Sequence, residues 1–155
     1  MERIETGDLA WRLAIEERSG TETAVLEGTE MSGARLRIMV MPPGGESVVI
    51  EVEGFAWPLG EEDIHPVALR LPSGARWPAH LRFVGAETMQ VTVPVHGGRL
   101  LAGLRAARWM RVEHQEHLLM LTLPPRGAVD ALQALATGYR PGSGAVPPPL
   151  AAAPG

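Results

Sequence analysis

The chain has 155 residues, a length that suits one domain with its own hydrophobic core. Its net charge of -4 disfavours nucleic acid as a partner, because phosphate backbones are bound by basic surfaces. All 14 basic residues are arginines and cysteine is absent, which excludes lysine nucleophiles, phosphate-loop lysines, disulfides and thiolate metal sites. A transmembrane helix needs about 18 consecutive apolar residues, and no stretch of the sequence approaches that length.

The first part of the chain alternates apolar and polar residues with the period of β-strands. In Leu9–Glu16 the odd-numbered residues are large and apolar, which predicts a half-buried strand. A second short strand is predicted at Thr23–Leu26, before a polar turn at Glu27–Gly33. These two segments therefore begin a β-rich fold.

The next two segments predict a hairpin. Arg35–Met41 alternates again, with Arg35 and Arg37 on its outward face. Ser47–Glu53 is rich in Val and Ile, and the breaker Pro42–Gly45 separates the two runs. A pair of strands around a Pro/Gly loop is the expected structure.

The middle of the chain is predicted to contain a second hairpin, a strand and a short helix. Val67–Leu71 and Leu81–Phe83 flank the loop Pro72–Pro78, which places Trp77 in that loop. Thr88–Val93 alternates as a strand does, and leucine spacing in Arg99–Ala107 favours a short helix.

The end of the chain is predicted to combine a last hairpin with a second helix. Arg108–Glu113 and Leu118–Leu123 are its two strands, around a polar turn. In Ala128–Thr137 apolar residues recur every three positions, which predicts a helix with one apolar face. From Gly138 onward Pro, Ala and Gly dominate, as is typical of a flexible tail.

These elements predict a mainly β fold in a single domain, residues 1–137, followed by the Pro/Ala/Gly-rich tail, residues 138–155. Strand spacings of roughly 8–12 residues favour an antiparallel β-sandwich or flattened barrel. Two short helices complete it, the last one C-terminal.

Catalytic and metal-binding patterns are weak. His114 and His117 are the only histidines close in sequence, and a metal site there needs a third ligand from elsewhere in the fold. Exposed polar residues are routine in hairpin turns, which is the simpler interpretation. No serine stands in a G-x-S-x-G motif, and Asp130 is expected to favour the positive end of a helix dipole. We therefore predict no catalytic residue, metal or cofactor.

One turn is a candidate anion site. His96 precedes Gly97, Gly98 and Arg99 at the start of the leucine-rich helix. Backbone amides at a helix N-terminus bind anions, and a guanidinium beside them adds positive charge. The alternative interpretation is a turn that needs glycine only for its backbone conformation.

Two tryptophans are candidate partner-binding residues. Trp57 and Trp77 each precede a proline, where the chain is extended. Exposed tryptophan beside arginine, such as Arg76, is typical of interface hot spots. Packing beneath a long loop explains both tryptophans as well. Pro147 and Pro148 in the tail complete the predicted partner-binding set.

Several short strand and helix motifs follow one another in a recognisable order from Val67 onward. The alternating Val67–Leu71 is followed by Leu81–Phe83 and by a leucine-rich helical turn at Leu100–Leu104. A strand then leads into spaced small and apolar residues, namely Leu123, Gly127, Ala131, Leu132 and Leu135. With Trp11 in the first strand, this pattern resembles the invasion-associated locus B family of bacterial envelope β-proteins. The chain differs from that family in having no cysteine pair, whose place Leu81–Glu87 occupies.

The resemblance implies an envelope-associated, non-enzymatic role. We expect a protein-binding or accessory subunit of a larger bacterial assembly, docking through strand edges, the Trp–Pro loops and the tail. The alternative is a small-molecule or anion-binding module that uses the His96–Arg99 turn. A periplasmic or envelope location follows from the resemblance. A cytoplasmic location follows if Met1 is the native start, because the first residues contain no apolar signal-peptide segment.

Overall fold

The computed structural model describes residues 2–5, 10–18, 20–30, 33–41, 47–54, 64–85, 87–94, 96–115 and 117–136. The helices of this part of the chain are α1 (Gly97–Ala106) and α2 (Arg126–Ala136). Its strands are β1 (Glu2–Glu5), β2 (Ala10–Arg18), β3 (Thr21–Thr29), β4 (Arg35–Met41), β5 (Ser47–Glu53), β6 (His65–Arg70), β7 (Arg76–Gly85), β8 (Thr88–Val93), β9 (Trp109–His114) and β10 (His117–Thr122).

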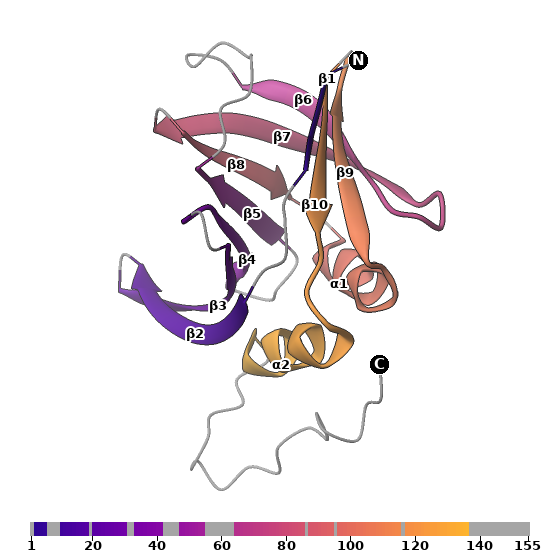
Figure 1. Ribbon diagram of the computed structural model, residues 1–155. Coiled ribbons are helices and arrows are strands. Elements are labelled where there is room, and N and C mark those ends of the chain that lie inside the picture. The colour runs from indigo at the N-terminus through magenta and orange to yellow at the C-terminus, as the bar shows by residue number, and fades with distance from the viewer. Residues whose placement is uncertain are drawn as a thin grey trace, which may run out of the picture.

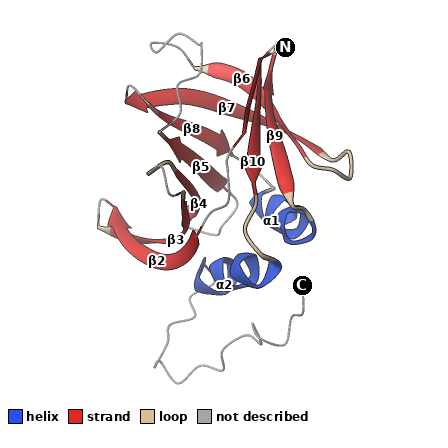
Figure 2. Cartoon of the chain, viewed as in Figure 1, coloured by secondary structure: helices blue, strands red, loops and turns tan. Residues whose placement is uncertain are grey.

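These strands form one continuous sheet that curls into a half-barrel (Figure 1). Their order is β1-β10-β9-β6-β7-β8-β5-β4-β3-β2. All neighbouring strands are antiparallel except β1 and β10, which run parallel. The predicted mainly β, antiparallel fold with two helices is therefore confirmed, and both helices lie at the same end of the sheet (Figure 2). No helix in the described ranges is both long and apolar enough to cross a membrane.

Most element boundaries agree with the sequence pattern, and β4, β5 and β8 coincide with the predicted ranges. β3 is longer than predicted and ends at Thr29, so the polar turn begins later than Glu27. The predicted loop Pro72–Pro78 is wrong in its second half, because Trp77 and Pro78 belong to β7. The turn itself is short: the Leu71 N–H donates to the Ala75 carbonyl at 3.0 Å.

Two prolines lie inside strands, and the sheet register explains why they are tolerated. Pro78 pairs with Ala68 of β6, but the pairing of β7 with β8 begins only at His80. Pro66 pairs with His80, while the pairing of β6 with β9 begins only at Ala68. Each proline therefore sits where its strand is paired on one side, and the missing N–H breaks no ladder on the other side.

The core fills the concave face of the sheet. Alternate residues of the strands point inward, such as Leu36 and Ile38 of β4, each 1% exposed. Leucines at helical spacing in α1 and α2 complete the same core, among them Leu104 and Leu132. α2 packs against α1 and against β2, β3 and β4. It therefore covers one end of the half-barrel and contacts strands from the first third of the chain.

Two glycines make room for tryptophans at this end. Trp11 of β2 pairs with Gly28 of β3, and its ring lies so close to Gly28 that an added Cβ would come within 2.9 Å of it. Trp77 of β7 is half-buried against α1, where a Cβ on Gly103 would lie 3.3 Å from its ring and 2.6 Å from Leu71. The Trp11 ring occupies the space of a side chain at Gly28, whereas at Gly103 that space is taken first by Leu71 and then by the Trp77 ring.

Candidate binding sites

A cleft lies where α1 ends, α2 begins and β2 passes near the end of β10. Its volume is about 770 Å³. The Leu123 N–H donates to the Arg108 carbonyl at 3.0 Å and ties two of its walls together. We call it the arginine cleft, after residues that include Trp11, Arg105, Arg108, Leu123, Pro125 and Arg126.

The positive charges of the arginine cleft are unequally compensated. Arg105 of α1 pairs with Asp130 of α2 through Nε and through Nη2, the latter at 3.2 Å from Oδ2. Asp130 thus joins the two helices, a role that its predicted dipole interaction did not include. Arg108 and Arg126 are exposed, and neither pairs with a carboxylate in the described part of the chain. Among the described residues, two of the three cleft arginines therefore have no carboxylate partner.

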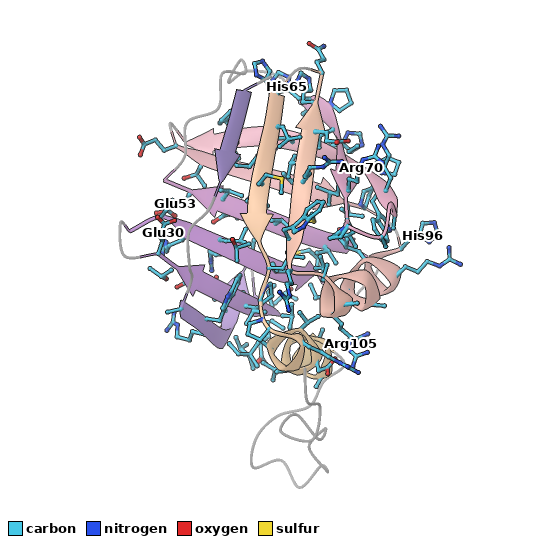
Figure 3. All side chains as sticks on the ribbon, turned by 45° about the vertical axis from the view of Figure 1, so that its right-hand side comes forward. Glu30, Glu53, His65, Arg70, His96 and Arg105 are labelled. Atoms are coloured by element: carbon cyan, nitrogen blue, oxygen red, sulfur yellow. The ribbon has the colours of Figure 1, made fainter. Side chains whose placement is uncertain are left out.

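Three histidines meet at the other end of the sheet. His114 and His117 face each other across the β9–β10 hairpin, with parallel rings whose centroids are 6.5 Å apart. His65 of β6 approaches His114 edge to face, at 5.3 Å between centroids. Figure 3 places His65 at the end of the sheet opposite Arg105 and the helices. The third histidine is a neighbour that the sequence spacing of His114 and His117 does not reveal.

The surroundings of His114 disfavour its protonation. Burial lowers the pKa of His114, and the neighbouring His65 and His117 lower this pKa further. His114 Nδ1 is buried and has no hydrogen-bond partner in the structure. Within the described ranges, no three His, Asp or Glu side chains are placed so that they could share a metal ion.

The His96–Arg99 turn is located as predicted, at the start of α1. His96 adopts a left-handed backbone conformation, with φ of 62°, and its side chain makes no capping hydrogen bond. Gly98 and Arg99 are exposed, and His96 points away from the sheet (Figure 3). These residues lie at the opposite end of α1 from the arginine cleft. An anion site at this turn stays a prediction.

Of the predicted partner-binding residues, the structure describes Trp77 and Arg76. Trp77 faces the core, whereas its neighbour Arg76 is exposed at the start of β7. The structure therefore gives Trp77 a packing contact, and a partner contact for it stays a prediction. Trp57, Pro147, Pro148 and the rest of the tail lie outside the described residues.

The two edges of the sheet are β1 and β2. β2 is the longer one, with 9 residues, and in the described part of the chain it pairs only with β3. Trp11 and Leu13 on its inner face are half-buried, and Ile15 is 37% exposed. Among the described residues, this edge therefore combines a backbone without a second strand partner and apolar side chains.

Comparison with family models, curated proteins and solved structures gives no match to this chain. The resemblance to the invasion-associated locus B family therefore rests on the short motifs described above.

Sequence reasoning missed the arginine cleft because its walls come from three separate segments of the chain. The alternating pattern predicts that Trp11 points inward, and no motif surrounds Arg105, Arg108 or Arg126 in the sequence. No local signal brings these segments together, because even the pairing of Trp11 with Gly28 is known only from the strand register.

Proposed function

We propose that this protein is a non-enzymatic, protein-binding accessory subunit that docks through the edge strand β2. The open edge of β2 carries the proposal. An unpaired strand offers a row of backbone N–H and C=O groups, to which an extended segment of another protein adds as a new strand. The resemblance to envelope β-proteins supports a bacterial envelope complex as the setting.

The side chains of β2 fit this mode of binding. An added strand gains affinity from main-chain hydrogen bonds and specificity from alternate side chains. Trp11, Leu13 and Ile15 alternate along the edge and remain partly accessible, which gives an incoming strand apolar contacts on one face. Arg12, which is exposed, offers a charged contact on the other face.

Site-specific photo-crosslinking in the native cell tests this proposal. A photo-crosslinking amino acid replaces Ile15, and a matched control protein carries it at Val84, which is 44% exposed on β7. We expect one protein to be captured in stoichiometric amount from position 15 and not from position 84. Ile15→Glu should then abolish co-purification of that protein, whereas Val84→Glu should leave it unchanged.

Equal capture at both positions would show that the label reports chance collisions. Retention of the captured protein by Ile15→Glu would place the contact elsewhere. Either result would contradict docking at β2.

A further inference from the structure

We propose that the arginine cleft binds an amphipathic anion, that is, an anionic headgroup on an apolar chain or ring. This inference goes beyond protein docking at β2 and does not depend on it, because the cleft is formed mainly by α1, α2 and the segment between β10 and α2. Trp11 is the single residue that the two surfaces share.

The charge of the cleft selects an anion. Arg105 is satisfied by Asp130, whereas Arg108 and Arg126 have no carboxylate partner among the described residues. A guanidinium binds carboxylate or phosphate oxygens through two parallel hydrogen bonds. Arg126 is also the first residue of α2, so the positive end of the helix dipole adds to the field at this point.

The remaining wall selects an apolar body. Between the arginines most of the lining is apolar, namely Ala107, Leu123, Pro124 and the ring of Trp11, and Thr122 adds one hydroxyl. This wall offers few hydrogen-bonding groups and no carboxylate or amide side chain, so a long polar ligand would lose more hydrogen bonds to water than it gains there. The volume of about 770 Å³ lies within the roughly 300–1,000 Å³ of small-molecule sites.

The cleft is held open by the fold itself. The Trp11 ring is fixed over Gly28, where a Cβ would approach it to 2.9 Å. The Arg105–Asp130 pair holds α1 against α2, and the hydrogen bond from Leu123 to Arg108 fixes the third wall. A ligand therefore meets a preformed site and does not have to order it.

Isothermal titration calorimetry with matched ten-carbon probes tests the proposal. Decanoate and decyl phosphate, each below its micelle concentration, share a chain with the neutral decanol and the cationic decyltrimethylammonium. We expect saturable one-to-one binding of at least one anionic probe and none of the cation. The stronger of the two anions identifies the headgroup that the site prefers.

Variants then locate the binding. Arg108→Ser and Arg126→Ser alter exposed side chains and should each weaken the anion by about tenfold, the effect of losing one charge-assisted hydrogen-bonded pair. Arg82→Ser, which removes an exposed arginine outside the cleft, should leave binding unchanged. Ala106→Trp fills the cleft without changing its charge and should abolish binding of the anionic probe.

Three outcomes would overturn the proposal: no saturable binding of either anion, equal binding of decyltrimethylammonium, or anion affinity that is unchanged in the Arg108→Ser, Arg126→Ser double variant. Binding of a tetraglutamate peptide in place of both ten-carbon anions would also overturn it, because the site would then recognise charge without an apolar body.

Discussion

His114 is the residue in which burial and neighbouring charge act in the same direction. Its imidazole is half-buried at the end of β9, with His65 and His117 on either side. Burial and these two histidines lower the pKa of His114 in the folded protein, below its ordinary value of about 6.5. His114 therefore binds a proton more readily in the unfolded chain than in the folded protein.

This difference predicts that stability falls in mild acid. The pKa of His114 is lower in the folded protein than in the unfolded chain. The contribution of neutral His114 to the free energy of unfolding is therefore fully present above pH 6.5, and it is lost as the pH falls from 6.5 towards the folded pKa. We expect the melting temperature to drop between pH 7.5 and roughly pH 5.5, and His114→Gln to flatten that drop. Thermal unfolding at a series of pH values measures both.

His80→Gln is the matched control for this experiment, because His80 is exposed on β7 and outside the histidine cluster. Its melting temperature should keep the pH dependence of the unchanged protein. If His114→Gln and His80→Gln gave the same curve, the histidine cluster would not be the source of the acid sensitivity.

At the scale of the elements, a ladder of charges ties the strands together on the convex face. Arg12, Glu27, Arg37, Glu51 and Gln90 are successive cross-strand neighbours on β2, β3, β4, β5 and β8. Arg37 is its centre: Nη1 donates to Glu51 at 3.2 Å, Nη2 donates to Glu16, and Nε lies 3.1 Å from Glu27. One guanidinium thus holds three carboxylates from three strands.

Arg37→Met is expected to destabilise the fold by about 3–5 kcal/mol, because the buried Glu27 and Glu51 lose their central counter-ion. Arg12→Met is the matched control. Its side chain is 70% exposed and pairs with the same Glu27 at 3.3 Å, so its loss should cost about 0–1 kcal/mol. Urea denaturation at neutral pH measures both free energies of unfolding. Equal effects of the two variants would contradict a central role for Arg37.

The ladder also shows a limit of reading burial from apolar–polar alternation. Alternation correctly places Arg37 on the outward face of β4, but it does not show that Arg37 is buried there. The residue is 8% exposed because carboxylates from neighbouring strands surround it. The same alternation located β4, β5 and β8, since each has one consistently buried face. β1 gave no such signal, because it has 4 residues and is defined by parallel pairing with the distant β10.

The sites depended still more on the fold. The sequence could identify His96–Arg99 because those residues are consecutive, and the structure does place them together at the start of α1. The arginine cleft joins two segments far apart in the sequence, Trp11 with Arg126, and the histidine cluster joins His65 with His114 of a later hairpin. Such sites follow from strand order, and no local pattern encodes the order of this sheet.

At the scale of the whole molecule, the last described helix completes a core that begins early in the chain. Val129, Leu132 and Leu135 of α2 lie in the same core as Leu26 and Leu36. Burying each large apolar side chain stabilises a fold by roughly 1.5–3 kcal/mol, so these three together supply roughly 5–9 kcal/mol. That amount is comparable to the whole stability of a typical domain, about 5–15 kcal/mol.

The sharpest whole-molecule prediction compares two truncations. Removal of residues 126–155 deletes α2 and should abolish cooperative unfolding, because the inner faces of β3 and β4 lose their cover. Removal of residues 138–155 spares every core residue of the described part of the chain, which ends with Leu135, and should leave the melting temperature unchanged. If the Pro/Ala/Gly-rich tail acts as a tether, this second truncation should still weaken co-purification of the protein captured at Ile15. Calorimetry and quantitative co-purification separate the two effects: a lower melting temperature would make residues 138–155 part of the fold, and an undiminished complex would exclude the tether.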